Sequence, residues 1–280
     1  MEIGRRGEAW AHKCLVKGDD YQAIDVYSEV LLRNADDAEA YRDRGFAYVR
    51  TGDHEHGIAD LTRSLELDPK SADAYFRRAT AYHKALDFKR AVNDCDTAIK
   101  LGYRPEDLVY RQRARAYMDQ GRLDLAIADF SQILRVSDDR RAYYERGLAW
   151  SKKGDIDKAI SDFTNGIESA HGPYPECYLQ RGYAYLLKDE PDNAIDDFTE
   201  AARNYYLRRD ACFGRAKAFM EKRASKRAVA EFTQAIRLTH DDPAAEADAY
   251  LERGRAYEQQ GLYRSAKRDF ATAKKLRYED

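Results

Sequence analysis

The sequence predicts an all-α fold, a solenoid built from antiparallel helix pairs, and three observations lead to this prediction. Small residues recur with a period of about 34 residues along almost the whole chain. Apolar residues within each period follow helical spacing. Many periods are interrupted near the middle by a turn sequence such as Thr51-Gly52-Asp53 or Lys153-Gly154-Asp155. The recurring small residues are Ala23, Gly57, Ala91, Ala126, Ala159, Ala194, Ala228 and Ala266.

Two further columns of residues keep the same period. A second small residue precedes each of the first, at Ala11, Gly45, Ala79, Ala114, Gly147, Gly182, Ala216 and Gly254. A larger residue follows on the next helical turn, at Tyr27, Leu61, Cys95, Phe130, Phe163, Phe198, Phe232 and Phe270. Paired small residues let two helices approach closely, and the larger residues fill the space beside them. Each period is therefore expected to be a helix, a tight turn and an antiparallel helix.

This combination of small, aromatic and turn positions resembles the tetratricopeptide repeat family. The resemblance covers residues 4–278 and implies one right-handed superhelix of eight repeats, with a concave groove lined by the first helix of each repeat. The expected repeats are 4–37, 38–71, 72–106, 107–139, 140–174, 175–208, 209–246 and 247–280. The junction from Thr239 to Ala247 is longer than the others. In the last repeat, Lys267 and Lys274 occupy the apolar positions that dock a following repeat, so we expect none to pack there.

Composition excludes two classes of partner. The chain has 48 Lys and Arg against 50 Asp and Glu, a net charge of −2. This balance provides no field to hold a nucleic-acid backbone. No apolar run reaches the length of about 18 residues that a membrane span requires. The sequence therefore predicts a protein that binds neither nucleic acid nor membrane.

The sequence also lacks the patterns of an enzyme. It contains no phosphate-binding loop, no serine nucleophile elbow and no zinc-protease motif. His54 and His56 are two residues apart, so they point to different faces of a helix and are not expected to share a metal. We expect no catalytic residue, no metal and no cofactor. Scattered cysteines favour reduced thiols and a cytoplasmic location; they are Cys14, Cys95, Cys177 and Cys212.

An arginine recurs on the packing face of the first helix, and a carboxylate recurs sixteen residues later on the second helix. The pairs include Arg44 with Asp60, Arg146 with Asp162, and Arg181 with Asp197. The first repeat has Trp10 and Val26 in these places, so both members of the pair are missing together. Joint presence and absence predicts an Arg–carboxylate bridge between the two helices, since a charge on a packing face needs a partner. The alternative is a ladder of arginines that reads phosphates.

Residues of the first helices that should face the groove form two zones. Repeats two to four offer a basic lining, with Arg42, Arg77, Arg111 and Arg115. Repeats five to seven offer an apolar lining, with Tyr144, Leu148, Leu179, Tyr183, Leu187 and Phe213. Contiguous apolar surface and aromatic or arginine anchors are typical of binding sites. For Tyr183 and Phe213, and for Leu186 and Met220, packing between neighbouring first helices is the alternative interpretation.

The leading hypothesis is a non-catalytic scaffold that binds a peptide or partner helix in its groove. The acidic part of this partner would lie over repeats two to four, and its apolar anchor over repeats five to seven. One alternative is a protein that assembles with itself through the apolar groove or the first repeat. Another is a regulator whose curvature responds to a ligand. A concentration series in light scattering separates a monomer from a weak dimer.

Overall fold

The structure is a computed structural model that describes residue 10, residues 12–239 and residues 242–278. Within these residues fifteen helices have defined bounds, and no strand occurs. Residues 12–17 are also helical and precede the first of them. The helices are α2 (Asp20–Arg33), α3 (Ala38–Thr51), α4 (His54–Leu67), α5 (Ala72–Lys84), α6 (Phe88–Lys100), α7 (Glu106–Asp119), α8 (Leu123–Val136), α9 (Arg140–Lys153), α10 (Ile156–Glu168), α11 (Pro175–Leu187), α12 (Pro191–Ala201), α13 (Arg208–Glu221), α14 (Ser225–Leu238), α15 (Pro243–Gln259) and α16 (Tyr263–Tyr278). The predicted all-α solenoid is confirmed.

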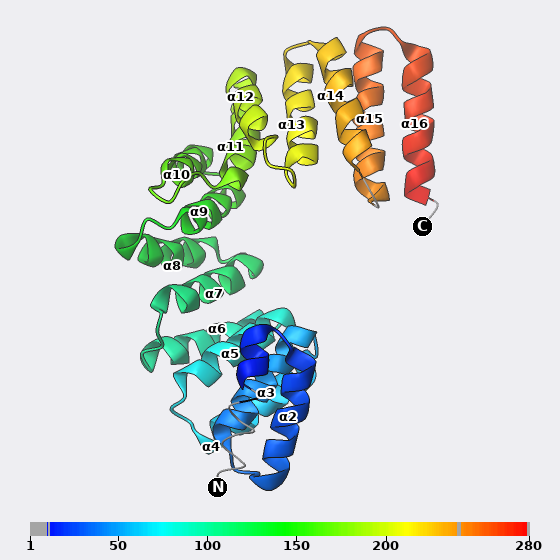
Figure 1. Cartoon of the computed structure of the whole chain (residues 1–280). Coiled ribbons are helices and arrows are strands. Elements are labelled where there is room, and N and C mark those ends of the chain that lie inside the picture. Colours follow the sequence, from blue (N-terminus) through cyan, green and yellow to red (C-terminus); the bar gives the residue numbers. More distant parts are fainter. Residues whose placement is uncertain (1–9, 11, 240–241, 279–280) are drawn as a thin grey trace. The chain divides into compact units, whose positions relative to one another are not determined.

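The chain divides into two compact units, which we call unit 1 (residues 1–136) and unit 2 (residues 137–280). Within each unit, consecutive helices run antiparallel and pack against one another (Figure 1). The first helices of the repeats are α3, α5 and α7 in unit 1 and α9, α11, α13 and α15 in unit 2. Residues 4–9, 240–241 and 279–280 of the expected repeats, and the predicted small residue Ala11, lie outside the described residues.

The turn between α3 and α4 shows why the chain reverses within a repeat. Gly52 has a φ of 92°, a left-handed conformation that glycine adopts without steric cost. Its neighbour Asp53 then accepts a hydrogen bond from the backbone N–H of His56 and so caps α4. An N-cap of this kind stabilises a helix by about 1 kcal/mol. Gly154 and Asp155 repeat the arrangement between α9 and α10.

The start of α15 differs from the expected repeat boundary at residue 247. This helix begins at Pro243, because Asp242 accepts a hydrogen bond from the backbone N–H of Ala245 and caps the helix there. Proline is well suited to the first turn, where its missing N–H would have no partner in the helix. The longer junction of the sequence is therefore partly taken up by an added turn of α15.

The recurring small residues allow the second helix of a repeat to press a large ring against the first. The ring of Phe198 on α12 is fully buried between Gly182 on α11 and Gly214 on α13. A Cβ atom at these glycines would lie 2.8 Å and 2.5 Å from the Phe198 ring, closer than real Cβ atoms come to neighbours. The core of each unit is therefore a line of rings and large aliphatic side chains held between small residues.

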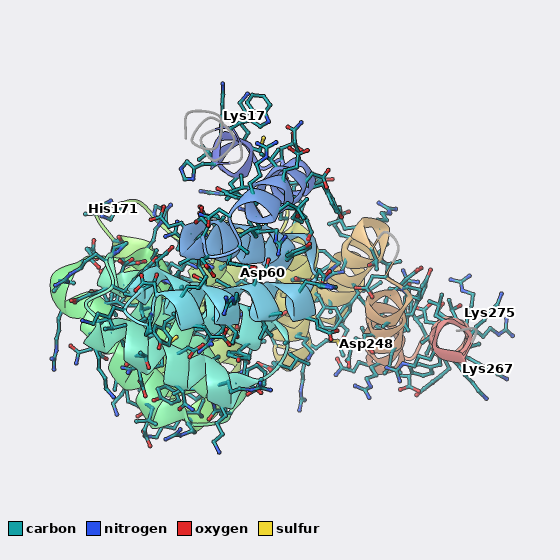
Figure 2. All side chains as sticks on the ribbon, turned by 90° about the horizontal axis from the view of Figure 1, so that it is seen from below. Lys17, Asp60, His171, Asp248, Lys267 and Lys275 are labelled. Carbon is teal, nitrogen blue, oxygen red and sulfur yellow. The ribbon has the colours of Figure 1, made fainter. Side chains whose placement is uncertain are left out.

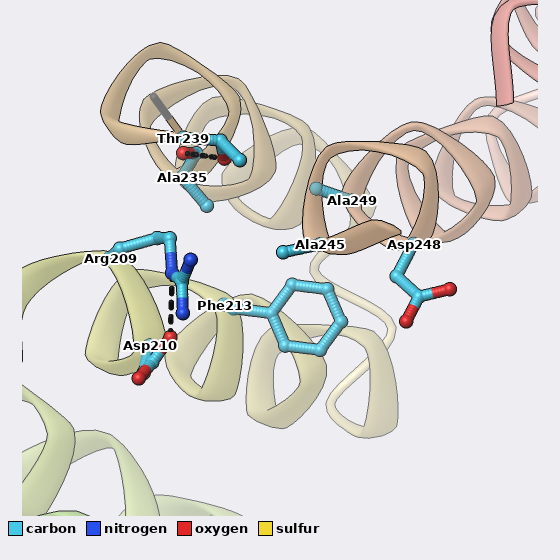
Figure 3. A pocket seen from close by; sticks show the side chains of 8 residues that line it. All are labelled: Arg209, Asp210, Phe213, Ala235, Thr239, Ala245, Asp248 and Ala249. Atoms are coloured by element: carbon cyan, nitrogen blue, oxygen red, sulfur yellow. Dashed lines mark hydrogen bonds and ion pairs between the residues drawn. The ribbon is translucent and has the colours of Figure 1, made fainter. Parts of the chain in front are cut away.

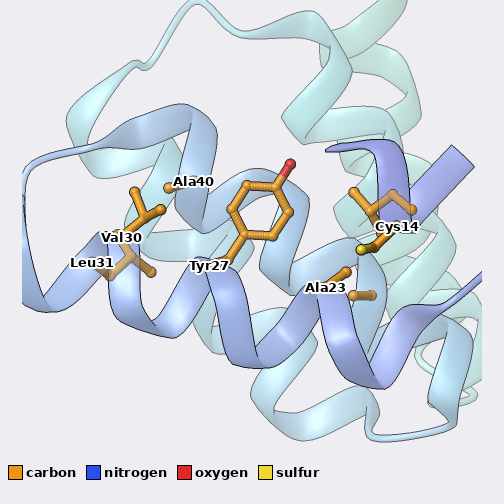
Figure 4. Close-up of a cluster of buried hydrophobic side chains, with 8 residues drawn as sticks. Cys14, Ala23, Tyr27, Val30, Leu31 and Ala40 are labelled. Carbon is orange, nitrogen blue, oxygen red and sulfur yellow. The ribbon is translucent and has the colours of Figure 1, made fainter. Parts of the chain in front are cut away.

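Unit 1 also contains a hydrophobic cluster that joins residues 12–17, α2 and α3 (Figure 4). Tyr27 lies at its centre with its ring buried, and its hydroxyl donates to the carboxylate of Asp43 at 3.1 Å. Burial raises the pKa of the Tyr27 hydroxyl, and the Asp43 charge adds to the effect. The cluster consists of Cys14, Leu15, Ala23, Tyr27, Val30, Leu31, Ala40 and Ala47.

The outer face of α16 is polar. Lys267 and Lys274 are exposed, and Figure 2 shows Lys267 and Lys275 pointing away from the helix. On the side of α16 opposite α15, these lysine side chains therefore face solvent.

The cysteines are buried and unpaired within this framework. Burial raises the pKa of the Cys177 thiol to about 12 and that of the Cys212 thiol to about 11. Since the thiolate is the reactive form, we expect the folded protein to resist alkylation by iodoacetamide at pH 8. Mass spectrometry should find these two thiols modified only after denaturation. Rapid modification of Cys177 in the folded protein would contradict its placement in the core.

Candidate functional site

The first helices lie on the inner side of each unit. Consecutive first helices contact one another, α3 with α5 and α5 with α7 in unit 1, and α9 with α11 and α11 with α13 in unit 2. Consecutive second helices show no comparable contact among the described residues of either unit. Repeats that are closer on one side form a surface that curves toward that side. We call this surface the first-helix face.

The recurring arginines lie between the two helices of a repeat and bind the matching carboxylates. In unit 2, Nε and Nη2 of Arg181 donate to the two oxygens of Asp197, each at 2.8 Å. This parallel pair of hydrogen bonds is the bidentate arrangement that suits a guanidinium and a carboxylate. The same geometry, with distances of 2.7–3.0 Å, joins Arg44 to Asp60, Arg78 to Asp94, Arg113 to Asp129, Arg146 to Asp162 and Arg253 to Asp269.

Glutamate gives a weaker version of the pair. Arg215 donates to Glu231 through Nη2 at 2.8 Å, while its buried Nε has no partner among the described residues. The extra methylene of glutamate changes the position of the carboxylate, so the second parallel hydrogen bond is not formed.

The third nitrogen of the same arginines reaches the preceding repeat, a contact that the sequence analysis missed. Nη1 of Arg181 donates to the hydroxyl of Thr164 on α10 at 2.8 Å, and this hydroxyl donates to the carbonyl of Ile160. Equivalent contacts of 3.0–3.2 Å join Arg44 to Ser28, Arg78 to Thr62, Arg215 to Thr199 and Arg253 to Thr233. Arg113 binds Asp96 in the same place. Each of these arginines therefore links three helices and two repeats.

A signal for this contact was present in the sequence. The hydroxyl or carboxylate stands two residues after the position of the paired acid, as in Asp60-Leu61-Thr62 and Asp197-Phe198-Thr199. Ser28 is present although the first repeat lacks the acid, because Arg44 of the second repeat needs it. In the last repeat the same place holds Ala271.

Aromatic rings complete the surroundings of each arginine. The guanidinium carbon of Arg181 lies 5.8 Å from the ring centroids of both Tyr178 and Tyr185, one turn before and after it on α11. Such cation–π contacts contribute about 0.5–1 kcal/mol at partly exposed sites. Because its three nitrogens already donate to Asp197 and Thr164 and two tyrosine rings cover its faces, the Arg181 guanidinium is poorly placed to bind a phosphate. Burial still raises the pKa of the Asp197 carboxyl, against the opposing effect of Arg181, so removal from water is the larger influence on this acid.

Two of the basic residues predicted for the groove of unit 1 are neutralised by neighbouring acids. Arg42 binds Asp43 at 2.9 Å and Asp73 at 3.3 Å. Arg77 binds Asp73 at 2.6 Å and lies over the ring of Phe46, with its guanidinium carbon 4.1 Å from the centroid. These contacts leave little excess positive charge on this part of the first-helix face.

The other two predicted basic residues lie on α7. Arg111 is only 8% exposed, and Arg115 is half-buried. A side chain as buried as Arg111 presents almost no surface to a partner.

The predicted apolar residues of unit 2 differ in what they expose. Leu179 is only 6% exposed and belongs to the core. Tyr183 packs edge-on against Phe198, with ring centroids 5.0 Å apart, and donates to the backbone carbonyl of Asp210 at 3.3 Å. Burial raises the Tyr183 pKa to about 12. Leu187, at the end of α11, is 73% exposed.

Tyr144 and Phe213 occupy equivalent positions in repeats five and seven, and Phe76 occupies the same position in repeat three. Tyr144 packs with Leu148 against the cluster around Phe163, and the ring of Tyr174 covers it at 5.3 Å. Phe76 is covered in the same way by the ring of Tyr103, at 4.6 Å.

Phe213 borders a cavity instead of a covering ring (Figure 3). The cavity is about 160 Å³ and lies between α13, the end of α14 and the start of α15. Figure 3 shows Ala245 next to the Phe213 ring, so small side chains leave the space open. Arg209 lies at the rim and binds Asp210 at 2.8 Å and Asp242 at 3.1 Å. The lining consists of Arg209, Asp210, Phe213, Ala235, Thr239, Ala245, Asp248 and Ala249.

A second, more open hollow lies further along the same helices. Its apolar part comes from α11 and from Met220 on α13, and it measures about 440 Å³. Phe213, Lys217 and Met220 are four and three residues apart, so they lie on one side of α13. The lining consists of Tyr183, Leu186, Leu187, Lys217, Met220, Glu221 and Glu252. We call the Phe213 cavity and this hollow together the apolar face of unit 2.

The described residues contain no group of three or more His, Cys, Asp and Glu side chains placed to hold a metal ion. In the same part of the chain, no helix combines the length and the apolar character needed to cross a bilayer.

This architecture is also found in known proteins. Two family models described as tetratricopeptide repeat match the chain, one at residues 14–80 and the other at residues 111–175, 179–243 and 213–273. The C-terminal part of a TPR repeat-containing protein from Cytophaga hutchinsonii has a similar structure, with a TM-score of 0.68 at 17% identity over 86% of this chain and 98% of that chain. A tetratricopeptide repeat protein from Parabacteroides merdae aligns with a TM-score of 0.65 at 16% identity over 95% of this chain and 100% of its own.

A third structure is YrrB, described as a TPR protein with an unusual peptide-binding site. It aligns with a TM-score of 0.52 at 20% identity, over 63% of this chain and 91% of YrrB. These likenesses agree on the fold, and the family models match more than half of the chain. The chain therefore belongs to the tetratricopeptide repeat family.

Proposed function

We propose that the protein is a non-catalytic scaffold that binds a peptide or a partner helix on the apolar face of unit 2. Tetratricopeptide repeats are protein–protein interaction modules, and the family match carries this general function. The observation that supports the specific surface is the cavity over Phe213, where related positions are covered by Tyr103 and Tyr174. An apolar side chain of the partner would fill this space, as anchor residues do in protein interfaces.

The second hollow supports a specific orientation of the partner. Phe213 and Met220 are seven residues apart on α13, a separation of about 10 Å along the helix. A partner helix with apolar side chains seven residues apart would match this spacing, and an extended segment would span it with about three residues. Leu187 would contact the second apolar side chain, since it is largely exposed at the hollow.

The neutralised arginines of unit 1 give less support to an acidic partner segment over repeats two to four. Arg42 and Arg77 already bind Asp43 and Asp73. The proposal therefore rests on unit 2. Buried, unpaired thiols support a reducing, cytoplasmic location.

The Leu187→Glu variant tests the proposal. Leu187 contributes little to the core, so the variant should keep the fold. A carboxylate at this position would be buried against an apolar partner without a hydrogen bond or ion pair, which disfavours binding. Each protein is immobilised and exposed to host lysate. We expect the variant to capture at least about tenfold less of the partner than the wild type does. The control is Leu32→Glu, a change of the same kind at an 88% exposed leucine on α2.

Circular dichroism should show the same helical content for the wild type and both variants. Equal capture by all three proteins would contradict the assignment of the binding surface to this face. A second copy of the chain as the occupant would appear as a concentration-dependent mass in light scattering.

A further inference from the structure

Leu86, in the turn between α5 and α6, has a backbone conformation that leucine rarely adopts. Its φ is 61°, in the left-handed region. The equivalent turns of unit 1 have glycine in this place, Gly52 with a φ of 92° and Gly121 with a φ of 71°, whereas two turns of unit 2 have Asp189 at 59° and Arg223 at 55°. A residue with a Cβ atom is strained in this conformation, and of these three non-glycine residues Leu86 has the apolar side chain.

The turn does not need the leucine side chain. The backbone N–H of Leu86 donates to the carbonyl of His83 at 3.0 Å, and that of Asp87 donates to Tyr82 at 2.8 Å. The Gly52 and Gly121 turns form the same backbone hydrogen bonds with glycine. The Leu86 side chain is 74% exposed, so it adds little to the core. Folding therefore favours glycine at this position, while the chain has a large apolar residue.

Leu86 stands at a wide hollow on the turn edge of unit 1, away from the first-helix face. Residues from the α5–α6 and α7–α8 turns line it, with a volume of about 770 Å³. Half-buried Phe88 adds a second apolar side chain. The lining consists of Ala85, Leu86, Asp87, Phe88, Lys89, Gln120 and Arg122.

The charge at this hollow is positive. Lys89 and Arg122 are exposed, and neither forms an ion pair with a carboxylate within the described residues. The guanidinium carbon of Arg122 lies over the ring of Tyr117, 4.9 Å from its centroid. The one acid of the lining, Asp87, caps α6 and is neutralised by Arg90. Two unneutralised cations beside an apolar side chain complement an acidic segment that carries an apolar residue.

We propose that this hollow is a second docking site, independent of the apolar face of unit 2, and that it binds an acidic partner segment with an apolar side chain. The apolar side chain contacts Leu86 and Phe88, and the carboxylates of the segment face Lys89 and Arg122. A scattered exposed leucine needs no explanation. Here a strained backbone and unpaired cations occur at the same place as the exposed leucine.

Three fluorescein-labelled peptides of twelve residues test the proposal on the full chain by fluorescence anisotropy. The first has Asp and Glu around a central Leu, the second has Ser for that Leu, and the third has Lys for every acid. We expect the wild type to bind the first peptide at least about tenfold more tightly than the other two, since burial of one leucine side chain suffices for such a difference. Raising the salt concentration should weaken this binding.

The Leu86→Gly variant separates binding from folding. We expect its Tm to equal that of the wild type or to exceed it by a few degrees, because glycine relieves the left-handed strain. Its affinity for the first peptide should fall about tenfold. The reciprocal control, Gly52→Leu, places the same strain in the neighbouring turn, so its Tm should fall while peptide binding stays unchanged.

Several results would overturn the proposal. These are equal affinity of the wild type and Leu86→Gly for the first peptide, equal binding of the Leu and Ser peptides, tighter binding of the Lys peptide, or no binding of the first peptide at all. A lower Tm for Leu86→Gly would show that the leucine serves the fold and would likewise overturn it.

Discussion

The Asp197→Ala variant is expected to lose about 3–5 kcal/mol of the free energy of unfolding of unit 2. Removal of the carboxylate leaves Arg181 between α11 and α12 without its bidentate partner, and the side chain of Arg181 is only 16% exposed. A buried charge without a partner costs far more than the intact pair contributes. Urea unfolding of the full chain, followed by circular dichroism, measures the loss.

The neighbouring residue offers a matched control on the same helix. Asp196 is exposed on α12, and its charge raises the pKa of Asp197. Because Asp196 is exposed, Asp196→Ala should leave the free energy of unfolding within about 0.5 kcal/mol of the wild type. Replacing both members of the pair, as Arg181→Met with Asp197→Leu, should restore much of the loss, because an apolar pair needs no compensation for burial. Equal unfolding curves for Asp197→Ala and Asp196→Ala would contradict the role of the bridge. The same loss is expected for Asp162→Ala, which removes the partner of Arg146.

The Ala245→Leu variant is expected to lower partner affinity at least about tenfold without loss of stability. Ala245 borders the Phe213 cavity, and a leucine there would fill space that the proposal assigns to the partner (Figure 3). Filling a cavity with apolar atoms commonly stabilises a protein, so the Tm should be equal or higher. Calorimetry with the partner captured by the wild type measures the affinity.

Ala244→Leu is the control for this change. Ala244 precedes Ala245 in the first turn of α15, is exposed and does not line the cavity. The Ala244→Leu variant should bind the partner with the affinity of the wild type. If Ala245→Leu also binds like the wild type while keeping its fold, the anchor of the partner lies elsewhere.

Much of the fold could be predicted from the sequence because the repeats constrain one another. The small residues at Gly182 and the ring of Phe198 follow the same period, and the structure brings them into contact. The pairing of Arg181 with Asp197 was visible because the first repeat lacks both partners. The contact of the same arginine with Thr164 does not follow from the pattern within one repeat, because Thr164 belongs to the preceding repeat.

The surface was harder to predict than the core, because a position on a helix does not give the depth to which its neighbours bury it. Leu179 and Arg111 have the spacing of groove residues, yet both are almost fully covered. The charge of Arg42 is offset in part by Asp73, which lies on the next first helix. The cavity at Phe213 depends on how the long junction before α15 is folded, and sequence spacing does not contain that information.

The most direct test of the central claim is photo-crosslinking from single positions of the full chain in host lysate. A benzoylphenylalanine at position 187 lies on the apolar face of unit 2, and one at position 196 lies on exposed surface of the second helix α12. The account predicts one covalent adduct from position 187 and none of the same mass from position 196. An adduct from position 196, with none from position 187, would place the partner on the second helices and contradict the account.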